Sequence, residues 1–182
     1  MSVSRRRFLG MAAAGGAAWT LPWLAGCASG TPATLRLGVG ADLHHDLVPD
    51  GAARLAALQS AAAEFGADAL AQLGDFCHPI ATNRPLLRQW REGPGPQIDV
   101  LGNHDMDGGF TSEATAHWLG MPARYHSFVL RGYRLIVLDG NERRPDLPSI
   151  KGYPRAVSDS QLAWLESTLA HDTLPVSYTH LR

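Results

Sequence analysis

Hydrophobic and polar positions follow two different periods in the first part of this chain. Apolar residues alternate with polar or small ones over 35–41, and short apolar runs occupy 69–73 and 98–101, which predicts three β-strands. Apolar positions three and four residues apart predict helices between them, over 50–66 and 84–91. Strands that alternate with helices favour right-handed crossovers and a largely parallel sheet. The predicted fold class is therefore α/β.

The ends of two predicted helices carry capping signals. Asp50 is the predicted N-cap of the first helix, and Gly66 is its predicted C-terminal stop. Ser158 and Gln161 have the spacing of a capping box, in which each residue bonds the backbone near the other. This box predicts a later helix over 158–169.

The second half of the chain contains a different arrangement of elements. Three of them are predicted from periodicity: a helix over 112–119 and two strands over 125–129 and 134–139. Arg131 and Gly132 lie between the two strands, which indicates a β-hairpin. The proline-rich stretch 143–154 is predicted to run over the surface.

Composition and charge exclude some classes of protein. The chain has 182 residues, of which 45% are hydrophobic, so disorder throughout is excluded. Sixteen basic and 17 acidic residues leave a net charge of −1, which offers no electrostatic footprint for nucleic acid. The two cysteines, Cys27 and Cys77, could close at most one disulfide. A hydrophobic core, and not a disulfide framework, must therefore support the fold.

The first residues have the pattern of an export signal. The run Ser4-Arg5-Arg6-Arg7-Phe8-Leu9 precedes an uncharged apolar stretch that ends in Leu24-Ala25-Gly26-Cys27. The first motif resembles a twin-arginine signal, and the second resembles the lipobox of bacterial lipoproteins. We expect 1–26 to be a cleaved signal peptide and 27–34 a short tether. Lipid on Cys27 would then anchor an exported protein at the membrane, on the periplasmic side or in the cell envelope. A transmembrane anchor is the alternative.

The last eight residues differ in character from the domain before them. Residues 175–182 follow the predicted helix directly and have no helical period. Back-translated, they resemble a transposase-end adapter used to build sequencing libraries. We interpret 175–182 as adapter-derived and 35–174 as the front part of an incomplete domain. The alternative is a genuine C-terminal strand.

Three predicted strands end in residues that can bind metal ions. In chain order these are Asp42 and His44, then Asp75, then Asn103, His104 and Asp105. Since the carboxyl ends of parallel strands meet at one crevice, residues far apart in sequence can meet there. Carboxylate, imidazole and amide oxygen are metal ligands, so this grouping predicts a metal site. Asp75, on the middle segment, is the candidate for bridging two ions.

The ordered set Asp-x-His, Gly-Asp and Gly-Asn-His-Asp resembles the signature of the calcineurin-like metallophosphoesterase family. The similarity extends over 35–174 and implies a sandwich of sheets with flanking helices. It further implies a role for each site residue. In this chain Asp42 and His44 would bind the first metal, Asp75 would bridge, and Asn103 would bind the second metal. His104 would be the catalytic acid that protonates the leaving group, and Asp105 would orient it.

The resemblance implies hydrolysis of a small phosphomonoester or phosphodiester. Two metal ions (Mn, Fe or Zn) would hold the hydroxide that attacks phosphorus, and a histidine would supply the leaving-group proton. Family members carry further downstream histidines, including a Gly-His-x-His, which this sequence lacks; we do not count His180, which lies in the interpreted adapter. We therefore expect the 182-residue chain itself to bind metal poorly and to be inactive. A lipid-anchored, non-catalytic metal- or ligand-binding module of the same fold, and a structural envelope lipoprotein, are the alternatives.

Several other residues near these motifs carry possible chemistry. His45 adjoins a predicted ligand, Cys77 and His78 follow the predicted bridging aspartate, and His126 begins a predicted strand. Whether these side chains touch substrate is left open. The more common outcome is a surface histidine or a buried, inert thiol. The sequence also leaves the substrate, the metal identity and the oligomeric state open.

Overall fold

The computed structural model describes residues 34–143, 152–153, 155–170 and 176–179. The predicted signal peptide and Cys27 lie outside the described residues. Within these residues, no helix combines the length and the apolar composition that crossing a bilayer requires.

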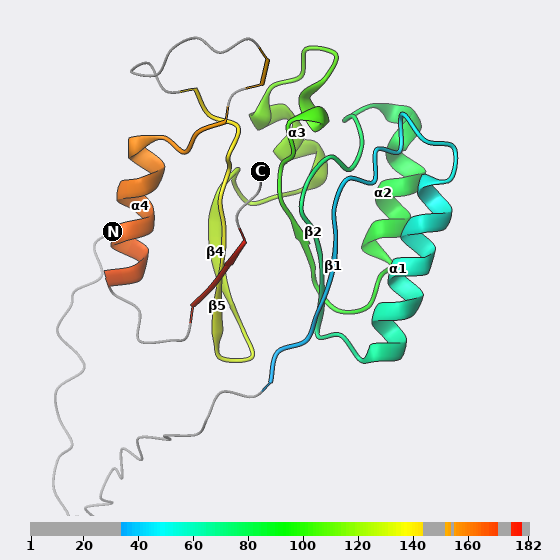
Figure 1. Ribbon diagram of the computed structural model, residues 1–182, viewed down its shortest axis with the longest axis horizontal. Coiled ribbons are helices and arrows are strands. Elements are labelled where there is room, and N and C mark those ends of the chain that lie inside the picture. Colours follow the sequence, from blue (N-terminus) through cyan, green and yellow to red (C-terminus); the bar gives the residue numbers. More distant parts are fainter. Residues whose placement is uncertain (1–33, 144–151, 154, 171–175, 180–182) are drawn as a thin grey trace, which may run out of the picture. The chain divides into compact units, whose positions relative to one another are not determined.

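The first half of the chain forms a parallel three-stranded sheet (Figure 1). Its strands are β1 (Leu37–Gly40), β2 (Ala69–Gln72) and β3 (Gln97–Asp99), in that order. Gly40 lies opposite Gln72, so β1 and β2 end at the same edge of the sheet. The predicted parallel arrangement is confirmed, and it places the ends of these strands side by side.

Two helices cover one face of this sheet, α1 (Gly51–Phe65) and α2 (Arg84–Arg91) (Figure 1). Leu70 of β2 is fully buried in one hydrophobic cluster with Leu55 of α1 and Trp90 of α2. Because full burial of a large apolar side chain contributes about 1.5–3 kcal/mol, these contacts fix the helices against the strands that carry the site.

Both ends of α1 lie where the capping signals predict, but the N-terminal cap lacks its side-chain hydrogen bond. Gly66 adopts the left-handed conformation, with φ 68°, and closes the helix as predicted. Asp50 precedes the helix, but its side chain makes no capping hydrogen bond. Its backbone has turned to φ −102°, ψ 12°, outside the extended region typical of an N-cap, and its carboxylate pairs with Arg54 at 2.9 Å. Asp50 therefore occupies the predicted N-cap position, but its side chain does not cap the helix.

The second half forms another sheet, in the order β4-β5-β6. The strands β4 (His126–Leu130) and β5 (Tyr133–Val137) form the predicted antiparallel hairpin. Arg131 and Gly132 both have positive φ, 51° and 83°, as a type I′ turn requires. Leu135 and Val137 of β5 belong to one buried cluster with residues of β2, Ala69 and Ala71.

Residues 176–179 form a strand, β6 (Val176–Thr179), parallel to β5. From its sequence, this segment is predicted to lie outside the domain, whereas in the structure its backbone pairs with the second sheet. The adapter origin of 175–182 stays a prediction, because strand formation does not depend on where a sequence came from.

The described residues contain two further α-helices, both in the second half of the chain, and two single turns of 3₁₀-helix. They are α3 (Ser112–Leu119), α4 (Asp159–Ala170), η1 (Ala81–Asn83) and η2 (His104–Met106). Parallel and antiparallel sheets combined with helices make this a mixed α/β fold.

Only half of the predicted capping box forms at α4. The Ser158 hydroxyl accepts the backbone N–H of Gln161 at 3.3 Å. The Gln161 side chain bonds the backbone of Asp139 and the Glu142 carboxylate, and it is fully buried. Ser158 N–H donates to Glu142 instead, at 2.7 Å. The Gln161 side chain bonds these distant residues and not the start of its own helix, because a buried amide must satisfy both its donor and its acceptor.

Candidate metal centre

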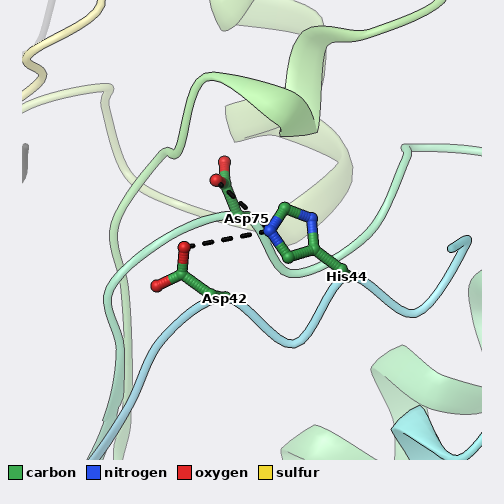
Figure 2. Close-up of side chains that lie close together, drawn as sticks. All are labelled: Asp42, His44 and Asp75. Atoms are coloured by element: carbon green, nitrogen blue, oxygen red, sulfur yellow. Dashed lines mark ion pairs between the residues drawn. The ribbon is translucent and has the colours of Figure 1, made fainter. Parts of the chain in front are cut away.

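Three predicted metal ligands meet at the shared edge of β1 and β2. Asp42 and His44 follow β1, and Asp75 follows β2; one ligand atom from each lies within 4.8 Å of the others. The Nε2 atom of His44 lies 3.8 Å from Asp42 Oδ1 and 3.7 Å from Asp75 Oδ2. Figure 2 shows the three side chains pointing toward one another.

All three residues adopt a backbone conformation that side chains normally avoid. Their φ angles are 56° at Asp42, 48° at His44 and 53° at Asp75. Residues in this left-handed region cost about 1–3 kcal/mol each and persist where the surroundings impose them. Backbone hydrogen bonds do so here, since Asp42 N–H donates to the Gly74 carbonyl at 3.1 Å and His44 N–H donates to the Asp75 carbonyl at 2.8 Å. The two loops are therefore held together in the conformation that groups the ligands.

Asp105 holds the second and third loops together. It is buried, and Oδ1 accepts the backbone N–H groups of Phe76 and Cys77 at 2.7 and 3.1 Å. Oδ2 accepts those of Gly102 and Asp75 at 2.9 and 3.1 Å. Burial raises the pKa of Asp105 to about 7, and the hydrogen bonds from Gly102, Phe76 and Cys77 act against that rise. Asp105 thus holds together the backbone segments that support Asp75.

Gly102 permits this close approach of the loops. A Cβ atom at this position would lie 2.1 Å from the backbone nitrogen of Asp75 and 2.2 Å from its Oδ1 atom. Any side chain here would therefore displace the backbone that carries Asp75.

His104 adjoins the cluster but has a different partner from the one the resemblance implies. Its backbone N–H donates to Asp75 Oδ1 at 2.8 Å, and its ring lies 5.1 Å from the His44 ring, centroid to centroid. The Nδ1 atom lies 2.8 Å from Oδ2 of Asp107 and 3.2 Å from the Tyr153 hydroxyl. The hydrogen bond with Asp107 raises the pKa of His104. The resemblance implies that Asp105 orients this ring; among the described residues no hydrogen bond joins the two side chains, and backbone donors contact both Asp105 oxygens.

A small cavity brings most of these residues to one place. Four of the predicted site residues line it together with five others, in chain order His44, Asp46, Leu47, Asp75, Cys77, His78, His104, Asp105 and Asp107. Asn103 directly precedes η2 as its N-cap residue. Asp42 completes the cluster from the exposed side, with 68% of its side chain accessible.

Sequence reasoning missed Asp46, Asp107 and Tyr153. Asp46 accepts the backbone N–H of His78 at 2.6 Å and the Asn83 side chain at 2.7 Å. Tyr153 belongs to the stretch predicted to run over the surface, but its hydroxyl donates to Asp107 at 2.8 Å. The sequence does contain a signal for Asp107, which is an acid three residues after His104.

The residues whose contact with substrate was left open are placed as follows. His45 lies against Gly51 of α1, and its Nδ1 atom is buried without a hydrogen-bond partner among the described residues. His126 stacks on Phe128 and faces the Ala123 carbonyl, and burial lowers its pKa. Neither histidine lines the small cavity. Cys77 is 4% exposed and belongs to the hydrophobic core.

The donor set of the cluster fits a divalent cation. Two carboxylates and one imidazole are typical ligands of first-row transition ions. The exposed side of Asp42 leaves the cluster accessible to solvent, as a catalytic metal site requires.

Comparisons with known sequences and solved structures give information on the fold alone. No protein-family model matches the sequence, and no curated protein sequence matches it. A crystal structure of a dimetal phosphatase from Danio rerio is similar over 75% of this chain, at a TM-score of 0.56 and 14% identity. The chain spans 65% of that protein's length. A protein of unknown function from Aquifex aeolicus is 19% identical, with a TM-score of 0.40 over 82% of this chain and 80% of that one. At these identities, the first likeness shows a shared fold.

Proposed function

We propose that this chain carries a metal-dependent phosphoesterase domain that hydrolyses a phosphomonoester or a phosphodiester. The observation that carries the proposal is the cluster of Asp42, His44 and Asp75 beside His104, at the ends of parallel strands. The shared fold with a dimetal phosphatase supports it. The buried cluster common to the two sheets supports the finer proposal of a metallophosphoesterase-like sandwich with flanking helices.

Each site residue has a role in this proposal. Asp42, His44 and Asp75 would hold one divalent ion, and Asp75 would share a second ion with Asn103. Metal ions bound there would polarise phosphoryl oxygens and stabilise the charge that develops during displacement. His104 would hold a proton for the leaving oxygen. Asp105 would keep Asp75 and the His104 loop in register through its backbone hydrogen bonds.

Metal binding tests the first step of this proposal. Isothermal titration with Mn²⁺ and with Zn²⁺ would compare the wild-type protein, expressed from its uninterrupted genomic reading frame, with the Asp75→Asn variant. We expect at least a 10-fold weaker affinity for Asp75→Asn, because the loss of a ligand or its support typically has effects of this order. Asp50→Asn, an exposed acid paired with Arg54, serves as the control and should bind like the wild type. Equal affinity in all three proteins would contradict the assigned site.

Catalysis is tested on the protein encoded by the uninterrupted genomic reading frame. Amplifying the locus and sequencing past Leu174 would test whether 175–182 is adapter-derived. Hydrolysis of 4-nitrophenyl phosphate and bis(4-nitrophenyl) phosphate is then measured with and without metal. We expect metal-dependent turnover that Asp75→Asn abolishes. Metal binding without any turnover would favour the non-catalytic module.

Export and lipid attachment on Cys27 are a separate proposal, supported by the two N-terminal sequence motifs. Labelling with radioactive palmitate in the source bacterium would compare the wild type with Cys27→Ser. We expect label in the wild-type protein alone, and recovery in the membrane fraction. Unlabelled wild-type protein would contradict lipidation.

A further inference from the structure

The turn that carries His104 also presents an acidic side chain beside it. The 3₁₀ turn η2 spans His104–Met106, and Asp107 follows it. Because a 3₁₀-helix has about three residues per turn, side chains at positions i and i+3 lie one above the other. Gly108 and Gly109, with φ 86° and 90°, then change the direction of the chain. The local backbone therefore places the Asp107 carboxylate against the His104 ring.

Both oxygens of Asp107 are engaged. Oδ2 lies 2.8 Å from Nδ1 of His104, and Oδ1 accepts the Tyr153 hydroxyl at 2.8 Å. The Tyr153 oxygen also lies 3.2 Å from Nδ1, and its ring meets the His104 ring edge-on, 4.9 Å between centroids. The three side chains therefore form a closed set of hydrogen bonds.

The positions of the protons follow from this arrangement. An ionised carboxylate only accepts, so Nδ1 of His104 must donate to Asp107. The single hydroxyl proton of Tyr153 goes to the other Asp107 oxygen, so toward Nδ1 the tyrosine oxygen can only accept. Nδ1 therefore carries a proton. Nε2 is the nitrogen of this ring that has no hydrogen-bond partner among the described residues.

We propose that Asp107 and Tyr153 are positioning residues that hold His104 as its Nδ1–H tautomer and leave Nε2 to exchange a proton with the substrate. The catalytic part rests on the proposed phosphoesterase function. As water adds to phosphorus, the bond to the leaving oxygen breaks and its electron pair stays on that oxygen. The oxygen takes the proton from Nε2 of the imidazolium, which leaves neutral imidazole with its proton on Nδ1.

Nitrogen NMR of the 182-residue chain tests the positioning role without any activity. Long-range ¹H–¹⁵N spectra at alkaline pH distinguish the two tautomers, and His104→Gln assigns the signal. We expect the Nδ1–H pattern in the wild type, a mixture of tautomers in Asp107→Ala, and recovery in Asp107→Asn, whose amide oxygen still accepts. Asp50→Ala is the control and should leave the spectrum unchanged. A wild-type Nε2–H tautomer, or an unchanged His104 signal in Asp107→Ala, would overturn the inference.

Tyr153→Phe tests the second positioning residue by the same spectra. Loss of the hydroxyl leaves Asp107 Oδ1 free to rotate, so we expect a broadened Nδ1–H signal with the tautomer retained. A spectrum identical to that of the wild type would remove Tyr153 from the proposal. Circular dichroism of every variant confirms that the fold persists.

Leaving-group dependence connects the tautomer to catalysis in the protein from the full reading frame. We expect Asp107→Ala to lower kcat about 10-fold for an alkyl phosphate, as outer partners of site histidines typically do. KM should stay unchanged, and 4-nitrophenyl phosphate, whose leaving group needs no proton, should be nearly unaffected. An equal loss for both substrates would overturn the proton-exchange role. Absence of turnover in the wild type would instead contradict the proposed function and leave the NMR result standing.

Discussion

The carboxylate of Asp105 accepts the backbone N–H of Phe76 over 2.7 Å, across 29 residues of sequence. This bond joins the loop after β2 to the loop after β3. Three further backbone N–H groups donate to the same carboxylate. Asp105 therefore supports the loop that carries Asp75.

We expect Asp105→Asn to destabilise the metal-free chain by about 1–3 kcal/mol, because the amide nitrogen would face buried N–H donors that need an acceptor. Urea unfolding at pH 8 measures this effect, since the carboxylate, with a pKa of about 7, is ionised there. Asp50→Asn is the exposed control. A loss below about 0.5 kcal/mol, the range of ordinary surface substitutions, would show that the four bonds contribute little.

The left-handed backbone conformation of Asp42 leads to a second prediction. With φ 56°, Asp42 occupies a conformation in which glycine carries no steric penalty. We expect Asp42→Gly to be more stable than Asp42→Ala by about 1 kcal/mol, the reverse of the usual order of these residues in a helix or strand. Both variants remove the carboxylate, so both should lose metal affinity alike. Thermal unfolding with calorimetry compares them, and an alanine variant at least as stable as glycine would argue against strain.

Arg124 pairs with a carboxylate that has no contact with solvent. Its Nη1 atom lies 2.6 Å from Oδ2 of Asp139, whose side chain is 0% exposed. We expect Arg124→Met to destabilise the chain by about 3–5 kcal/mol, because it leaves a buried charge without its partner. The Glu113 carboxylate also contacts Arg124 but is 72% exposed. Glu113→Gln should therefore change stability by less than about 1 kcal/mol. Urea unfolding of both variants makes the comparison, and equal effects would contradict the role of burial.

Cys77 should be chemically inert in the folded chain. Burial, with smaller contributions from Asp105, Asp46 and Asp99, raises the pKa of its thiol. A raised thiol pKa means less of the reactive thiolate, so alkylation should stay slow between pH 7 and pH 9 and become fast in urea. Iodoacetamide labelling followed by mass spectrometry measures the rates in a Cys27→Ser variant, which leaves Cys77 as its one thiol. Rapid labelling of the folded variant would show that the thiol is accessible.

The cluster of candidate metal ligands could be predicted because its determinants are local. Asp42, His44 and Asp75 each follow a strand directly, and parallel strands bring their carboxyl ends together at one edge. The strand periods and the hairpin turn at Arg131 and Gly132 are also local features, and the structure contains them. Patterns of residues close together in the sequence were therefore sufficient to predict these elements.

The partners of Asp105 and His104 could not be predicted in the same way. The family resemblance implied that Asp105 would orient His104, whereas the buried Asp105 carboxylate accepts N–H groups of another loop. The hydrogen-bond contacts of the His104 ring are instead with Asp107, one 3₁₀ turn away, and with Tyr153, 49 residues beyond His104.

By itself, therefore, the sequence determined the α/β class, the order of the elements as far as α4, and the three candidate ligands that strand ends bring together. Only the tertiary structure decided which polar groups satisfy one another. It turned Gln161 away from its capping box, gave Asp50 an ion pair with Arg54, and brought Tyr153 to the site. The physical reason is that periodicity and turn chemistry act over a few residues. A buried hydrogen bond, by contrast, depends on which groups lose water together when distant segments pack.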